Sequence, residues 1–249
     1  MFMKRTWIIL TNFKDVRAKI EIDPEFGASP MDRKSEIGQP IIYNVILDIS
    51  RSMEDFYDEL VACFNRIMIP SLKEAIKRNK SPLRLGCLLF SEKLLPAWKG
   101  FRSLNELGSE PLKRSTLEQS GLQGRTALYG AMKAGILWTA ASMEHMKDHG
   151  QGEVPKGKII VLTDGDNNEP PMRKSAVTKA RGSMDPLECE NLSLSLGFLN
   201  TNNEISEVNF RNICRSTGFQ DLGFYTSDKN NTLQDRRDSF KNQFRKIFR

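Results

Sequence analysis

The sequence predicts an α/β protein with a doubly wound, mostly parallel sheet that is flanked by helices. Short runs that are almost continuously apolar recur along the chain, as is typical of strands buried on both faces of a parallel sheet. Segments with apolar residues three or four positions apart lie between these runs and indicate helices. The two patterns alternate along the chain, which favours parallel strands joined by helical crossovers.

The expected strands come first. They are Ile41–Leu47, Leu83–Phe90, Lys158–Thr163, Leu192–Leu199 and the short Leu222–Tyr225. Leu94–Trp98 follows the second of these so closely that we expect it to pair with that strand as an antiparallel edge strand.

Helices are expected between the strands. Apolar residues of Phe56–Met68 share one helix face, and Pro70 is expected to break or kink that helix before the pattern resumes. A second helix extends from Thr126 to about Met146, and small residues such as Gly135 would let it press close to the sheet. The remaining two helices are expected over Ile205–Cys214 and Leu233–Phe248.

The first 38 residues lie outside this alternation. Apolar residues of Val16–Ile22 alternate strictly, so we expect this segment and Trp7–Leu10 to form a hairpin added to the sheet edge. Asp23–Phe26 also resembles the product of adjoining restriction sites, which leaves open that part of the segment is a cloning remnant. We therefore divide the chain into an N-terminal extension, residues 1–38, and one domain, residues 39–249.

Composition restricts the class of protein. With 39% hydrophobic and 27% charged residues in a chain of 249, the sequence is typical of one globular domain and too apolar for a disordered chain. No apolar run approaches the roughly 18–20 residues that span a bilayer, and no secretory signal is recognised. The net charge of +6 is mild and does not indicate a nucleic-acid partner. We expect a cytoplasmic protein that binds no membrane.

Cysteine and histidine offer no strong metal signal. The four cysteines are far apart and form no C-x-x-C pair, so a disulfide framework or zinc site is not expected and a reducing compartment fits. His145 and His149 are four apart on one helix face, but no third ligand is evident, and we interpret them as cations near a helix end. Gly108–Gly124 and Gly165–Asn191 are rich in turn residues and expected to be irregular, although the basic residues of Arg173–Arg181 suit a solvated helix face.

Oxygen-bearing side chains follow two of the expected strands. Asp48 and Asp164 each come directly after a buried apolar run, and ligands gather beyond the carboxyl ends of such strands. Ser50 and Ser52 follow Asp48 at alternate positions, and Thr126 stands at the start of a helix. This all-oxygen set, without cysteine or histidine, suits a hard cation such as Mg²⁺, with Mn²⁺ or Ca²⁺ as other candidates.

At these residues the chain resembles the von Willebrand factor type A (vWA) domain family. The metal-ion-dependent adhesion site (MIDAS) of that family consists of D-x-S-x-S, a threonine before a helix, and T-D-G after a later strand. All three parts have a match here, in the same order. The matching residues are Asp48, Ser50, Ser52, Thr126 and Asp164 with Gly165. The resemblance extends over about Pro40–Arg249 and implies a Rossmann-like fold.

The resemblance also implies roles. In it, Ser50, Ser52 and Thr126 contact the metal, the two aspartates act through water or hydrogen bonds, and an acidic residue of a partner protein fills the last position. The implied function is a non-enzymatic, Mg²⁺-dependent protein-binding adaptor. Intracellular bacterial members of the family, including the TerY-like type, serve AAA+ ATPases, kinases or phosphatases.

Two residues depart from the family pattern. Arg51 stands between the serines and Arg125 before the threonine, where many members of the family have glycine. Their guanidinium groups either point into solvent or bind a second anionic group of the partner, since arginine pairs with carboxylate and phosphate through two hydrogen bonds.

Other interpretations of the same residues remain. Asp48 after an apolar strand is similar to the start of haloacid-dehalogenase-type phosphatases, but Ser50 stands where those enzymes need a second aspartate as general acid. A metal-dependent phosphatase using Asp48, or a regulatory subunit of an AAA+ or kinase–phosphatase assembly, is the alternative. In the plainest interpretation, Asp48 and Ser50 cap the next helix and Asp164 begins a turn.

Overall fold

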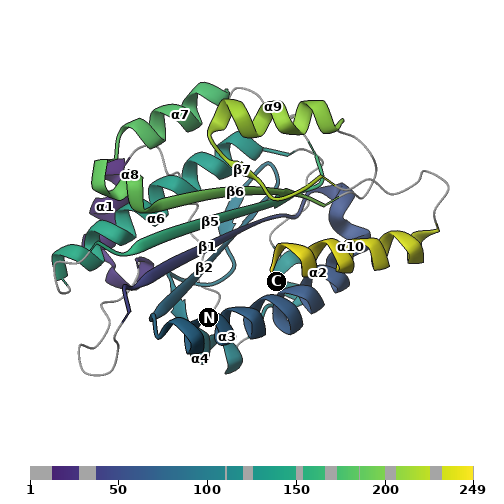
Figure 1. Ribbon diagram of the computed structural model, residues 1–249, viewed down its shortest axis with the longest axis horizontal. Helices are drawn as coiled ribbons and strands as arrows, with labels where there is room; N and C mark the ends of the chain where they lie inside the picture. Colours follow the sequence, from purple (N-terminus) through teal and green to yellow (C-terminus); the bar gives the residue numbers. More distant parts are fainter. Residues whose placement is uncertain are drawn as a thin grey trace.

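The computed structural model describes residues 13–27, 38–109, 111–119, 126–149, 154–165, 173–184, 186–199, 206–224 and 232–248. Over these residues the chain forms a seven-stranded, mostly parallel sheet in the order β3-β2-β1-β5-β6-β7, with β4 paired to β2 off this path. Helices cover both faces of the sheet (Figure 1): α1, α6, α7, α8 and α9 lie on one side, and α2, α3, α4 and α10 on the other. The predicted fold class is confirmed.

The four central strands are parallel and lie close to their predicted bounds. They are β1 (Ile41–Asp48), β2 (Leu83–Phe90), β5 (Lys156–Thr163) and β6 (Leu192–Phe198). β1 lies between β2 and β5, and nearly all of its residues are buried, which explains its continuous apolar pattern.

Three short strands complete the sheet. β3 (Leu94–Pro96) pairs antiparallel with β2, as predicted, and β4 (Arg102–Ser103) does the same further along β2. β7 (Gln220–Asp221) pairs with β6 and precedes the predicted segment Leu222–Tyr225, of which Tyr225 lies outside the described residues.

The long helix α6 (Leu128–His149) packs against β1 and β5. A side chain at Gly135 would overlap the Cδ1 methyl of Ile46 on β1, so a residue without Cβ allows this close approach. On the same side of the sheet lie α7 (Lys174–Gly182), α8 (Pro186–Asn191) and α9 (Glu207–Thr217). The first two fall inside the stretch predicted to be irregular, which is therefore partly helical.

The opposite face is covered by a nearly continuous helical segment and by α10. The segment comprises η2 (Arg51–Phe56), α2 (Tyr57–Cys63), the π-helical η3 (Phe64–Met68) and α3 (Ile69–Asn79). Pro70 lies in the first turn of α3, directly after the π-helical turn, so the chain stays helical around it. The wider turn gives space to the proline ring, which has no N–H and crowds the carbonyl one turn before.

Three further helices belong to the described residues. They are α4 (Leu104–Ser109), α5 (Arg114–Glu118) and α10 (Leu233–Ile247). Buried residues Phe240 and Phe244 of α10 pack in the same apolar cluster as Phe56 of η2. No described helix combines the length and apolarity that crossing a membrane requires.

The predicted N-terminal strand is wrong, because Phe13–Ile22 forms helix α1. Val16 and Ile20 are buried and Ala18 between them is exposed, so the apolar residues that matter are four apart and share a helix face. α1 packs on α6, and the short η1 (Pro24–Phe26) follows it. The other half of the expected hairpin, Trp7–Leu10, lies outside the described residues.

Residues after α1 are tied to the body of the protein. The indole N–H of Trp138 on α6 donates a hydrogen bond of 2.9 Å to the carbonyl oxygen of Phe26, and the two rings are in contact. Lys99 forms ion pairs with Asp23 and Glu25. The described residues of the N-terminal extension therefore form part of one folded unit with the sheet and helices.

Candidate functional site

The carboxyl ends of β1, β2 and β5 meet at one edge of the sheet. Asp48, the last residue of β1, pairs in register with Phe90, the last residue of β2. The N–H of Ile49 donates a 2.8 Å hydrogen bond to the carbonyl of Phe90. Thr163 ends β5 on the other side of β1. The residues that follow these strands are thereby held next to one another.

The carboxylate of Asp48 is fixed by two hydrogen bonds. It is 1% exposed; Oδ1 accepts the backbone N–H of Ser50 at 2.8 Å, and Oδ2 accepts the hydroxyl of Thr163 at 2.6 Å. The first bond sets the direction of the chain after β1, and the second joins β1 to β5. Thr163 was not among the predicted site residues, although the T-D-G motif contains it.

Ser50 and Ser52 present neighbouring hydroxyls. Their Oγ atoms lie 3.2 Å apart, with Ser50 buried and Ser52 half-buried. Tyr57 of α2 donates its hydroxyl to the carbonyl of Ile49 at 2.8 Å and so holds the same loop in place. Burial, reinforced by the negative charge of Asp48, raises the pKa of Tyr57, which keeps the phenol protonated as a donor. No pattern in the sequence pointed to Tyr57.

Thr126 and Asp164 reach this edge from other elements. Thr126 is buried just before α6, and the N–H of the next residue, Ala127, donates a 2.9 Å hydrogen bond to the carbonyl of Ser91, which directly follows β2. Asp164 is buried and directly follows Thr163. The five predicted site residues thus all follow or adjoin the carboxyl ends of β1, β2 and β5.

Of the two arginines that depart from the family pattern, one lies within the described residues. Arg51 is exposed at the start of η2, between the two serines. Arg125, the other residue of the predicted pair, lies outside the described residues.

The donor chemistry of the five residues fits a hard divalent cation. All of the side-chain donors are oxygens, which Mg²⁺ and Ca²⁺ prefer. Two neighbouring ligands of an octahedral Mg²⁺ lie about 2.9 Å apart, given its ligand distance of roughly 2.0–2.1 Å. The observed 3.2 Å between Ser50 Oγ and Ser52 Oγ is close to that spacing.

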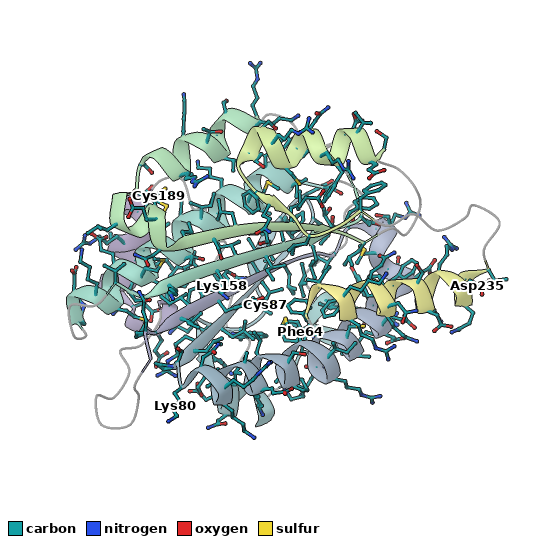
Figure 2. The ribbon with its side chains drawn as sticks, viewed as in Figure 1. Phe64, Lys80, Cys87, Lys158, Cys189 and Asp235 are labelled. Atoms are coloured by element: carbon teal, nitrogen blue, oxygen red, sulfur yellow. The ribbon has the colours of Figure 1, made fainter. Side chains whose placement is uncertain are left out.

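Clusters of acidic, histidine and cysteine side chains would form another kind of metal site in the described part of the chain. It contains no group of three or more His, Cys, Asp or Glu residues able to hold a metal ion. The rings of His145 and His149 are in contact, and Nδ1 of His149 lies 3.0 Å from the carbonyl oxygen of His145. The four cysteines are free; Cys87 is buried inside the sheet layer and Cys189 lies on α8 (Figure 2).

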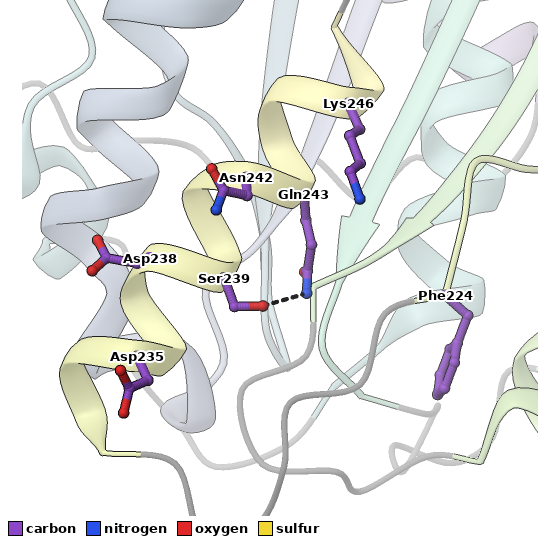
Figure 3. Close-up of a pocket in the computed structure, with 7 residues that line it drawn as sticks. All are labelled: Phe224, Asp235, Asp238, Ser239, Asn242, Gln243 and Lys246. Carbon is purple, nitrogen blue, oxygen red and sulfur yellow. Dashed lines mark hydrogen bonds between the residues drawn. The ribbon is translucent and has the colours of Figure 1, made fainter.

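A separate hollow lies beside α10. It has a volume of about 640 Å³ and is lined by residues of α10 and by Phe224 (Figure 3). The side-chain amide of Gln243 donates to the hydroxyl of Ser239 within it at 3.2 Å. None of the five predicted site residues lines this hollow.

Comparisons by sequence found no relative: no family model matches the chain, and no curated protein matches it. The fold, however, is the Rossmann-like fold of vWA-type domains, with a mostly parallel sheet between two layers of helices.

Three solved structures illustrate this fold. The pilus adhesin SpaC from Lactobacillus rhamnosus GG has a TM-score of 0.53 and 11% identity over 86% of this chain and 31% of that chain. The PilB minor pilin from Streptococcus sanguinis has a TM-score of 0.53 and 14% identity over 88% of this chain and 63% of the pilin chain. A von Willebrand factor type A protein from Catenulispora acidiphila has a TM-score of 0.51 and 13% identity over 84% of this chain and 43% of its own. The chain spans less than two thirds of each of these proteins, and such low identity shows the fold alone.

Proposed function

We propose that this chain is a non-enzymatic, Mg²⁺-dependent protein-binding adaptor whose ion is held by Asp48, Ser50, Ser52, Thr126 and Asp164. The observation that carries the proposal is the hydrogen-bonded group at the end of β1: Asp48 fixes the loop, and two hydroxyls lie 3.2 Å apart on it. When bound, the ion supplies an open coordination position for the carboxylate of a partner's Glu or Asp. Mn²⁺ and Ca²⁺ are alternative ions for the same oxygen set.

The environment of Asp48 supports binding over catalysis. A phosphatase of the haloacid-dehalogenase type uses such an aspartate as nucleophile, yet here both oxygens accept hydrogen bonds and the side chain is buried. Ser50 also cannot act as the general acid that those enzymes place two residues later. A pilus adhesin among the proteins of the same fold agrees with a binding role.

Arg51 supplies a second contact in this proposal. Its side chain is exposed next to Ser50 and Ser52, where it can pair with another anionic group of the partner. Replacing both Arg51 and Arg125 by glutamate is therefore expected to abolish partner binding while leaving Mg²⁺ binding intact. Unchanged partner affinity would show that both side chains only face solvent.

The metal alone provides the first test. Calorimetric titration with MgCl₂ is expected to show one site in the wild-type chain and no binding by Asp48→Ala. Asp55→Ala is the matched control, because Asp55 is an exposed aspartate of η2, the element that follows Ser50. Equal Mg²⁺ binding by Asp48→Ala and the wild type would overturn the proposal.

The bridging role needs a second measurement. Proteins retained from a native extract by the immobilised chain are expected to be released by EDTA and absent from the Asp48→Ala column. Binding that survives EDTA would rule out metal bridging even though the fold is correct. Turnover of a generic phosphoester that is lost in Asp48→Asn would decide for the phosphatase.

We further propose a cytoplasmic adaptor of the TerY-like type that serves an AAA+ ATPase, a kinase or a phosphatase. The four free cysteines support a reducing compartment. Co-purification from the native host followed by mass spectrometry tests this, and recovery of none of these enzyme classes would contradict it.

A further inference from the structure

Ser91, the residue that directly follows β2, carries a buried hydroxyl that no described residue satisfies. Ser91 is 1% exposed, and its Oγ has no hydrogen-bond partner among the residues that the structure describes. Both backbone groups are engaged, because its N–H donates to the carbonyl of Lys93 and its own carbonyl accepts the N–H of Ala127. A buried hydroxyl without a partner is unfavourable, so such a group calls for an explanation.

The position of Ser91 supplies an explanation for its buried hydroxyl. The residue before it, Phe90, pairs with Asp48 and accepts the N–H of Ile49. The carbonyl of Ser91 accepts the N–H of Ala127, the residue that follows Thr126. Ser91 is therefore held between two of the stretches that carry the candidate metal ligands. Thr163 lies on the β5 side of Asp48, and Ser91 lies on the β2 side.

Two other buried polar atoms without a partner among the described residues, Asn44 Oδ1 and Ser142 Oγ, lie far from the strand ends and serve as a comparison. Asn44, which binds Thr139 of α6, is four residues before Asp48 on β1, or about 13 Å away at the rise of a strand. Ser142 is roughly 20 Å along α6 from the start of that helix.

We infer that Ser91 is a positioning residue of the metal site: its hydroxyl oxygen accepts a hydrogen bond from a water molecule on the ion. This inference rests on the proposed function. Mg²⁺ usually keeps several waters when a protein binds it, and groups that hold those waters orient the site. Ser91, which directly follows β2, then adds a fourth hydroxyl to those of Ser50, Ser52 and Thr126.

Two matched substitutions test the inference. Ser91→Ala and Ser142→Ala each remove one unsatisfied buried hydroxyl, so in EDTA both are expected to melt at the wild-type temperature or slightly above it. In MgCl₂ only Ser91→Ala is expected to differ: its Kd for Mg²⁺ rises about tenfold or more, as for other groups outside the ligand set. Its Mg²⁺-dependent rise in Tm shrinks accordingly, while Ser142→Ala keeps both wild-type values.

Other results of these measurements would contradict the inference. Wild-type Mg²⁺ affinity in Ser91→Ala would overturn the inference, and so would a lower Tm in EDTA with unchanged affinity, because that pair marks a structural role. If Ser91→Ala does not fold, Ser91→Cys nearly keeps the volume but offers only a weak acceptor, and the same loss of affinity is expected. Absence of Mg²⁺ binding by the wild type would overturn the proposed function as well, whereas wild-type binding with an unaffected Ser91→Ala overturns this inference alone.

Discussion

Among single residues, the candidate site is organised around one buried carboxylate. Asp48 accepts a backbone N–H from its own loop and a hydroxyl from β5, so it holds together two segments that are 115 residues apart in sequence. Burying a carboxylate is costly unless hydrogen bonds replace those it made to water. The donors to Asp48 are therefore expected to contribute to stability as well as to the geometry of the site.

Thr163→Val tests this contribution. The variant keeps the side-chain shape but removes the hydroxyl that donates to Asp48 Oδ2 at 2.6 Å, so the free energy of unfolding is expected to fall by about 1–3 kcal/mol. Urea unfolding measures the change. Thr217→Val is the control, because the buried Thr217 donates to carbonyls of its own helix α9, and the loss of its hydroxyl is expected to cost less. Equal losses in the two variants would contradict the role given to Thr163.

The residues of the site differ in how far the sequence reveals them. Asp48, Ser50, Ser52, Thr126 and Asp164 have recognisable spacings and positions after apolar runs. Tyr57 and Ser91 have no such signal. Tyr57 donates a hydrogen bond to the loop after β1, and Ser91 accepts one from Ala127, just before α6. A motif of short spacing cannot encode contacts between separate elements.

At the level of elements, α6 combines the apolar length of a core helix with glycines that have different surroundings. Gly135 faces Ile46 of β1, within the core between helix and sheet, whereas a Cβ at Gly130 would meet no atom closer than 3.9 Å. The same substitution is therefore expected to have opposite effects at the two positions.

Gly135→Ala is expected to lower the free energy of unfolding by about 1–3 kcal/mol, because the added methyl overlaps Ile46 and the packed core must shift. Gly130→Ala is expected to raise it by about 0.5–1 kcal/mol, because alanine favours the helical backbone and finds space. Thermal or urea unfolding of the two variants measures the difference. Effects of the same sign would contradict the close approach of α6 to β1.

Two elements show why local patterns can mislead. Apolar residues at 16, 18, 20 and 22 fit both a strand and, through the pair Val16 and Ile20, a helix. Packing of α1 on α6 selects the helix and leaves Ala18 exposed. Similarly, Pro70 predicts a break on local grounds, but the π-helical turn of η3 accommodates it.

Across the whole molecule, the sheet separates two apolar cores, and buried thiols lie in both. Cys63 and Cys87 belong to the core under α2, α3 and α10, and Cys214 to the core under α6 and α9. Burial raises the pKa of Cys63 and of Cys214 to about 11 and raises that of Cys87 further. These thiols therefore stay protonated in the folded state at pH values where an unfolded chain begins to ionise them.

Stability is accordingly expected to fall in alkali. An ordinary thiol has a pKa of about 8.5, so between roughly pH 8 and 11 the unfolded state binds fewer protons than the folded state, and a rise in pH favours unfolding. Below that range both states keep the protons, and these thiols add no pH dependence. The midpoint of urea unfolding, followed from pH 8 to 10.5, is expected to decrease.

A double variant isolates the thiols from other groups. Cys63→Ala with Cys214→Ala is expected to show a flatter decrease over the same pH range, whatever its stability at pH 8. An identical slope in the variant and the wild type would show that these thiols do not cause the effect.

The sequence alone determined the α/β class, the central strands and the long helix that precedes β5. It also determined the five oxygen-bearing residues that follow or adjoin the strand ends. These follow because parallel strands buried on both faces must be apolar throughout, and because side chains after such strands gather at one edge. Only packing decided that residues 13–22 are helical, that the chain continues as a helix through Pro70, and that Thr163, Tyr57 and Ser91 surround Asp48 and its loop. The packing of α1 on α6 and the hydrogen bonds that join Thr163 to Asp48 and Ala127 to Ser91 link elements distant in the chain, which no local pattern contains.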